Sequence, residues 1–131
     1  MHSIGITAAQ IIPEKGIFKG KSDLIVLNDK TLSLARDVAQ IVEFKSGTWS
    51  ERTYPNSLLG VIAVIRQTFL DASWYGKSDE IVKKYPQENE PIPYNPSLLE
   101  LSKFQSSRSP VMFITKEEHG ALRSLKIAEE F

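Results

Sequence analysis

The chain has 131 residues, of which 41% are hydrophobic and 24% charged, the composition of an ordinary soluble globular domain. That length is enough for one hydrophobic core and too short for two comfortable domains. Sixteen basic residues offset sixteen acidic ones, so no overall field would draw nucleic acid or an anionic membrane to it. The absence of cysteine excludes disulfides, thiol catalysis, Cys-ligated zinc and iron–sulfur clusters.

Residues 1–56 are predicted to be strands and loops. Residues 4–12 form a nearly continuous apolar run, which predicts a strand covered on both faces, as in a parallel sheet. Residues 14–22 carry two glycines and three lysines and are predicted to be a long solvated loop. A further strand is expected over residues 23–27. Residues 38–44 fit both a strand and a helical face, and their content of Val, Ile and Phe favours a strand.

Residues 57–75 carry the clearest pattern in the chain and predict the central helix. Ser57 follows a proline and an asparagine and is suited to cap the first turn. Gly76 is predicted to end the helix. Apolar residues recur at steps of three and four, as expected for a helical face that packs on a core: Leu58, Val61, Ile62, Ile65, Phe69 and Ala72.

Residues 76–109 are polar and rich in proline, and predict a connection that contains one short helix over residues 96–104. Asn95 is placed to cap that helix. Residues 110–131 predict a buried strand followed by a helix. Thr115 and Glu118 match a capping box, with Thr at the cap and Glu three residues later.

Few residues in the chain are suited to catalysis or metal binding. There are two histidines, one near the N-terminus and the other, His119, expected on an exposed helix face beside two glutamates. Arg66 and Asp71 lie on the otherwise apolar central helix, which favours a structural contact and leaves a substrate contact open. Arg66, Asp71 and His119 are therefore the weak candidates for contact with a substrate or partner, and no catalytic, cofactor-binding or metal-ligating residue is assigned.

Several segments resemble one enzyme family. The block Tyr-Pro-Asn-Ser-Leu-Leu-Gly at residues 54–60, together with residues 65–75, resembles bacterial amidohydrolases, the imidazolonepropionase-like members of the metal-dependent hydrolase superfamily. Residues 3–9 resemble the second-strand region of that barrel and residues 14–20 the loop after it. Residues 110–131 resemble a later strand–helix unit, so the similarity extends over nearly the whole chain.

The resemblance implies an α/β fold, a partial (β/α) barrel of mostly parallel strands with flanking helices, forming one partial domain over residues 1–131. It implies hydrolysis of amide or cyclic amide C–N bonds by a water that a divalent metal, expected to be zinc, activates. The family's His-x-His motif has no counterpart here. The chain is thus expected to be an internal fragment that binds no metal by itself and is catalytically incompetent alone.

Other expectations follow from the resemblance and its gaps. The partner would be the remainder of the barrel or a self-associated copy, because a partial barrel exposes strand edges. No nucleic acid and no membrane span are expected, and the family implies export from a bacterium, although the chain shows no signal peptide of its own.

The alternative is a non-catalytic α/β binding or assembly module that uses the segment from Gly16 to Gly20. Whether the chain by itself is an enzyme stays open.

Overall fold

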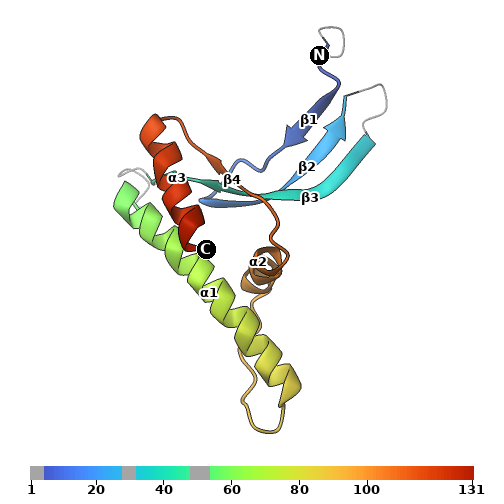
Figure 1. Cartoon of the computed structure of the whole chain (residues 1–131), viewed down its shortest axis with the longest axis vertical. Helices are drawn as coiled ribbons and strands as arrows, with labels where there is room; N and C mark the ends of the chain where they lie inside the picture. Colours follow the sequence, from blue (N-terminus) through green and yellow to red (C-terminus); the bar gives the residue numbers. More distant parts are fainter. Residues whose placement is uncertain (1–4, 28–31, 48–53) are drawn as a thin grey trace.

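The computed structural model describes residues 5–27, 32–47 and 54–131, and the interpretations that concern the other residues, the first histidine among them, lie outside it. The described residues contain four strands and three helices (Figure 1). They are β1 (Ala8–Ile11), β2 (Phe18–Val26), β3 (Leu32–Glu43), α1 (Leu58–Lys84), α2 (Pro96–Ser106), β4 (Val111–Ile114) and α3 (Glu118–Glu130).

The strands form one mixed sheet in the order β1-β2-β3-β4. β1 pairs with β2 and β2 with β3 in antiparallel orientation, and β3 pairs with β4 in parallel. The expectation of mostly parallel strands is therefore wrong, because two of the three pairings are antiparallel. Apolar runs look alike in both kinds of ladder, and the connections between the first three strands are short enough for hairpins, whereas parallel strands need a long crossover.

The hydrophobic core lies where the second half of β3 meets the helices. Its buried side chains come from β3, α1, α2 and α3: Val42, Val61, Ile65, Phe69, Ala72, Leu101 and Ile127. The first half of β3 is exposed, and with β1 and β2 it projects away from the helices (Figure 1). The predicted two-sided burial of residues 4–12 is wrong, because β1 is a mostly exposed edge strand with no helix over it.

The predicted loop over residues 14–22 is for the most part the start of β2. Phe18 pairs with Val42 and Gly20 with Ile41, so Lys19 is the extra residue of a β-bulge. Gly20 has a φ of +100°, a left-handed conformation that glycine adopts without steric cost. Of the glycines and lysines that suggested a loop, Lys19, Gly20 and Lys21 thus belong to a bulged strand, and Lys15 and Gly16 precede it.

The helix α1 begins as predicted and ends later. The Ser57 side chain accepts a hydrogen bond from the backbone N–H of Gly60 at 3.2 Å, which confirms the N-cap. Gly76 lies inside the helix and does not end it, because the helix continues to Lys84. A Cβ added at Gly76 would lie 1.8 Å from Ser102 Oγ and 2.9 Å from its Cβ, so this glycine allows α1 and α2 to pack closely.

The other two helices show one correct and one incorrect cap. Asn95 caps α2 by accepting from the backbone N–H of Leu98 at 3.1 Å, as predicted. The capping box at Thr115 is wrong, since α3 begins at Glu118 after Glu117, which makes no capping hydrogen bond. Thr115 instead packs against the first turn, where a Cβ on Gly120 would lie 2.9 Å from the Thr115 Cβ. In the part of the chain that the structure describes, no helix is long and apolar enough to span a membrane.

Candidate functional site

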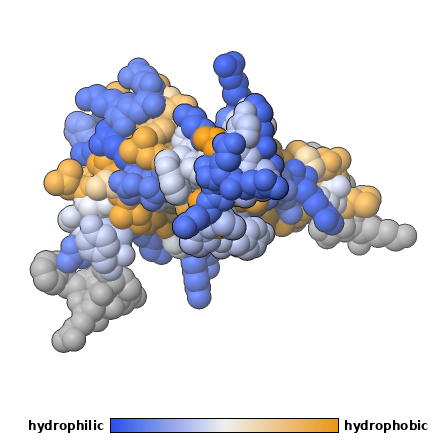
Figure 2. Space-filling view, turned by 90° about the horizontal axis from the view of Figure 1, so that it is seen from below, coloured by the Kyte–Doolittle hydropathy of each residue, from blue (hydrophilic) through white to orange (hydrophobic). Residues whose placement is uncertain are grey.

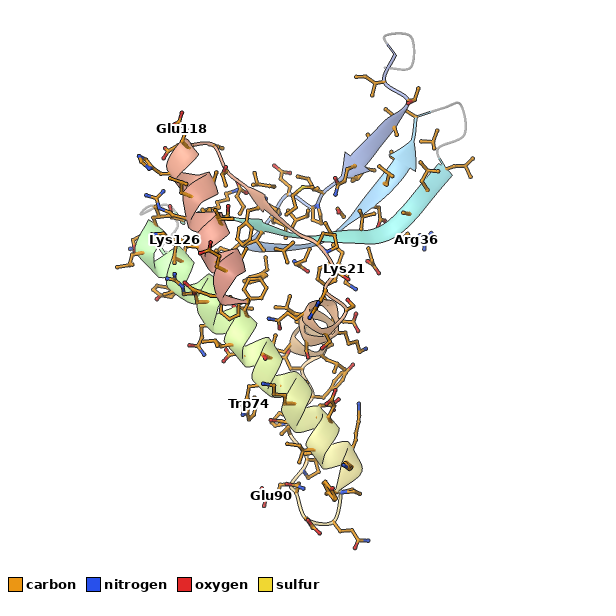
Figure 3. All side chains as sticks on the ribbon, viewed as in Figure 1. Lys21, Arg36, Trp74, Glu90, Glu118 and Lys126 are labelled. Atoms are coloured by element: carbon orange, nitrogen blue, oxygen red, sulfur yellow. The ribbon has the colours of Figure 1, made fainter. Side chains whose placement is uncertain are left out.

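The parallel pair β3 and β4 places two carboxyl ends at one edge of the sheet. Glu43 pairs with Ile114 at the last position of both strands, and the first turn of α3, with Glu118 labelled in Figure 3, follows directly. A polar pocket of about 430 Å³ opens between these ends and the start of α3. We call it the carboxyl-end pocket, and its charged lining residues are Glu43, Lys45, Lys116, Glu117 and Arg123.

Glu43, which lines this pocket, forms a partly buried ion pair with Lys19. The Lys19 ammonium lies 2.8 Å from the Glu43 carboxylate, with the two side chains only 5% and 18% exposed. Lys19 also donates a hydrogen bond to the carbonyl oxygen of Glu14. The bulge in β2 aims Lys19 inward, and the last residue of β3 supplies its partner. The sequence pattern assigned Lys19 to a solvated loop, because one lysine among three in a polar stretch carries no signal of burial.

The pocket does not fit the divalent metal that the resemblance implies. Three of its five charged residues are cations, and the Glu43 carboxylate is engaged by Lys19. Within residues 5–27, 32–47 and 54–131, no group of three His, Cys, Asp or Glu side chains is placed to hold a metal ion. A carboxylate or imidazole set is what zinc requires in a chain without cysteine, and the lining of this pocket does not supply one.

A second, larger depression lies between β4 and α3. This β4–α3 groove measures about 1020 Å³ and is lined mainly by apolar side chains. Val111 and Met112 of β4 are 38% and 41% exposed, and Leu122 and Leu125 of α3 are 59% and 58% exposed. Phe131, at the end of α3, lines the same groove and packs on Phe69 with ring centroids 5.2 Å apart.

Two polar features accompany the groove. β4 is the last strand in the sheet order, so its outer edge pairs with no described strand. The side-chain oxygen of Gln105, which also lines the groove, is buried without a hydrogen-bond partner among the described residues. Buried polar atoms are normally paired, so this oxygen can accept a hydrogen bond from water or from a group that enters the groove.

The three candidate residues from the sequence are not brought together. The Arg66 guanidinium of α1 makes two hydrogen bonds to Glu130 of α3, at 2.6 and 2.5 Å. Asp71 accepts from the Gln67 side chain one turn away at 2.6 Å. His119 is exposed in the first turn of α3, about 16 Å along that helix from Glu130. Arg66 and Asp71 thus make structural contacts, and none of the three lines the carboxyl-end pocket or the groove.

The Arg66–Glu130 contact also changes the acidity of both groups. The hydrogen bond from Arg66 is the main cause that lowers the pKa of Glu130 below the usual range; desolvation opposes it and the Arg66 charge adds to it. The hydrogen bond to Glu130 raises the pKa of Arg66. Both side chains are 41% exposed, so the pair links α1 to α3 at the surface.

Comparison with known proteins finds a fold relative. The chain is similar to the crystal structure of an amidohydrolase from Thermotoga maritima MSB8, with a TM-score of 0.73 at 19% sequence identity. The match covers 96% of this chain and 34% of that one, so the chain spans about a third of the relative's length. No protein-family model matches the chain. No curated protein matches it either.

The comparison supports an amidohydrolase-like fold. At 19% identity the likeness concerns the fold alone, and it does not assign the imidazolonepropionase-like subgroup. The mixed sheet and its flanking helices are consistent with part of a barrel.

Proposed function

We propose that this chain is a wall segment of an amidohydrolase-type barrel, whose C–N bond hydrolysis requires residues beyond those of this chain. The observation that carries the proposal is the superposition of nearly all of the chain on a third of an amidohydrolase. The remaining two thirds of such a fold would supply the other strands and the metal ligands. The metal would supply an activated water there.

The β4–α3 groove supports this proposal. A barrel continues by adding a parallel strand to the free edge of β4 and a helix over the neighbouring apolar surface. The first residues of β4 and the last turn of α3 line the same groove, which is where such a strand would begin. An added strand and helix would cover Val111, Leu122 and Leu125 and place a donor within reach of Gln105.

In this proposal the carboxyl-end pocket contributes to the mouth of the barrel, where enzymes of this fold place their active sites. The Lys19–Glu43 pair fixes the end of β3 there, and Lys45, Lys116 and Arg123 make this part of the rim cationic. These residues would orient an anionic group of the substrate or a neighbouring carboxylate. They would not take part in the bond-breaking step.

The experiment compares the chain alone with the chain joined to its companion. The 131-residue chain is titrated with Zn²⁺ and Mn²⁺ in a calorimeter and assayed with amide and cyclic amide substrates. We expect neither stoichiometric metal binding nor turnover, and we expect both when it is co-purified with the polypeptide that adjoins it in its native cells. Tight one-to-one metal binding with hydrolysis by the chain alone would contradict the proposal.

The alternative, a free-standing binding or assembly module that uses the segment from Gly16 to Gly20, gains little from the structure. Ile17 and Phe18 of that segment pack against the core, and the Phe18 ring contacts the Phe69 ring edge-on at a centroid distance of 5.3 Å. Lys19 is paired with Glu43. The second half of the segment, from Phe18, is therefore part of β2 rather than an open loop.

A further inference from the structure

The carboxyl-end pocket has more positive charge than its own carboxylates can match. Three cations of its lining make no ion pair with a described residue: Lys45, Lys116 and Arg123. Of the two lining carboxylates, Glu43 is already engaged by Lys19 at 2.8 Å. Only Glu117 then remains to balance the three cations. The described lining therefore has an excess of positive charge, although the chain as a whole is neutral.

The other charged clusters of the described chain are matched internally. The end of α1 faces the viewer in Figure 2 and is largely hydrophilic, and there the Lys83 ammonium lies 2.6 Å from the Asp79 carboxylate. Between β2 and α2, Glu100 contacts both Lys21 at 3.2 Å and Lys103 at 2.8 Å. These clusters need no anion from outside, which distinguishes the carboxyl-end pocket from them.

Arg123 is the cation best suited to hold a ligand in this pocket. It is half-buried, whereas Lys45 and Lys116 are exposed. It follows Gly120 by three residues, so the two lie on one face of α3, and both line the pocket. A guanidinium presents a planar fork of donors that can make two parallel hydrogen bonds to one oxyanion. Partial exclusion of water strengthens such a contact.

The start of α3 adds to the positive field of the three cations. A Cβ on Gly120 would lie 2.9 Å from the Thr115 Cβ, so the absence of a side chain lets the first turn of α3 lie against the end of β4. The N-cap residue Glu117 makes no side-chain hydrogen bond to that turn. Its backbone N–H groups therefore keep their partial positive charge beside the pocket.

We propose that the carboxyl-end pocket binds an oxyanion group of a small molecule, a phosphate or a carboxylate, with Arg123 as its main ligand. Lys45 and Lys116 add to the attraction. The volume of about 430 Å³ lies within the range of small-molecule sites, roughly 300–1,000 Å³, so the pocket can also hold part of the molecule that carries the anion. This inference deepens the role that the proposed function gives the pocket and rests on that proposal only for its place at the mouth of a barrel.

The test is an NMR titration of the full chain, labelled with nitrogen-15, with inorganic phosphate and separately with acetate at constant ionic strength. The signals followed are the Gly120 amide and the Arg123 Nε–H group. We expect both to shift and saturate with a dissociation constant of about 1–10 mM for phosphate, because the site is open to water and salt screens the contact. Acetate should bind more weakly, since it carries one charge and phosphate nearly two.

Variants of the lining separate a specific site from general attraction. Arg123→Gln should raise the phosphate dissociation constant at least about fivefold, and Arg123→Lys, which keeps the charge and loses the fork, should give an intermediate value. Glu117→Gln removes the unmatched carboxylate and should lower the constant about twofold. Lys126→Gln is the charge-matched control, because Lys126 is an exposed cation of α3 outside the pocket lining (Figure 3). Circular dichroism verifies that each variant keeps its fold.

The outcomes distinguish the ligands and the two proposals. Tighter binding of phosphate identifies a phosphorylated ligand and tighter binding of acetate a carboxylate, and either result supports the site. No saturable shift with either anion, or equal weakening by Arg123→Gln and Lys126→Gln, would overturn the inference. Loss of phosphate binding in the chain co-purified with its companion would also overturn it, because a carboxylate of the companion would then fill the pocket. A complex that binds the anion but neither metal nor amide substrate would contradict the proposed function and leave this inference in place.

Discussion

The Lys19–Glu43 pair shows how a single residue can carry a structural role that its local sequence hides. It joins the bulge of β2 to the end of β3 with little exposure to water. Removing two charges from water costs free energy, and only their mutual attraction offsets this cost. The pair therefore adds little to the stability of the fold by itself. Removing one leaves the other charge buried and unpaired.

We predict that Lys19→Met lowers the free energy of unfolding by about 1–2 kcal/mol, because the partly buried Glu43 carboxylate then loses its partner. Lys19→Met/Glu43→Met should recover most of this loss. Urea denaturation followed by circular dichroism measures both. Lys83→Met, which breaks an exposed pair one turn apart on α1, is the control and should have no measurable effect. An unchanged midpoint in Lys19→Met would mean that the pair is not buried in solution.

A second residue-scale prediction concerns acidity. The hydrogen bond from Arg66 lowers the pKa of Glu130 in the folded chain. A carboxyl with a depressed folded pKa stabilises the fold above its unfolded pKa, and this contribution disappears as pH falls through the folded pKa. The Arg66–Glu130 link between α1 and α3 should therefore weaken in acid.

Carbon-13 NMR titration of the Glu130 carboxyl tests this directly. We expect a pKa below the usual range in the wild-type chain and a higher one in Arg66→Ala. Arg123→Ala is the control: it removes an arginine that lies on α3, the helix of Glu130 itself, and should leave the Glu130 titration unchanged. An equal Glu130 pKa in the wild-type and Arg66→Ala chains would show that the contact does not form.

At the scale of elements, local signals predicted the starts of α1 and α2 but not that of α3. Ser57 and Asn95 have the short polar side chains that satisfy first-turn N–H groups, and both do so. Strand orientation was not predictable, because an apolar run such as that of β3 suits either kind of ladder. The end of α1 was missed for a related reason. Glycine stops a helix by its backbone freedom, whereas Gly76 is needed for its lack of a side chain against Ser102.

The packing of α1 on α2 gives the element-scale prediction. Gly76→Ala improves helix propensity by about 1 kcal/mol, but its Cβ would overlap Ser102. We expect a net destabilisation of about 1–3 kcal/mol, because the helices must separate to admit it. In a Ser102→Gly background the same change should be neutral or stabilising. Thermal unfolding of the four variants measures this coupling, and additive effects would exclude a direct contact between the two positions.

The candidate site was only partly predictable at this scale. The strand–helix unit of β4 and α3 was expected from its apolar run and helical periodicity, and it forms one side of both the carboxyl-end pocket and the groove. Arg66, Asp71 and His119 were chosen by residue type. Residue type does not show that Glu130 and Gln67 already engage the first two. The pairing of Lys19 with Glu43 depends on a bulge and on strand register, which no local pattern encodes.

At the scale of the whole molecule, the groove is the surface that the barrel proposal requires to be covered. We predict that the chain alone binds the dye ANS through this groove and that Leu122→Lys/Leu125→Lys reduces the dye fluorescence at least about twofold. The two leucines are 59% and 58% exposed, so the substitutions should leave the fold intact. Tyr94→Lys is the control at an exposed site outside the groove. If the dye fluorescence of Leu122→Lys/Leu125→Lys equals that of Tyr94→Lys, the dye binds at a surface other than the β4–α3 groove.

The central claim is that these residues form one part of a larger barrel, and the intact mass of the native polypeptide tests it most directly. An antibody raised against the segment from Ser57 to Tyr75 would detect it in denatured extracts of the native cells, and a native gel would show its complexes. We predict a species several-fold heavier than 14.7 kDa on denaturation, or a 14.7 kDa species held in a complex with a companion that completes the barrel. A 14.7 kDa chain that is found free of any companion protein would contradict the account.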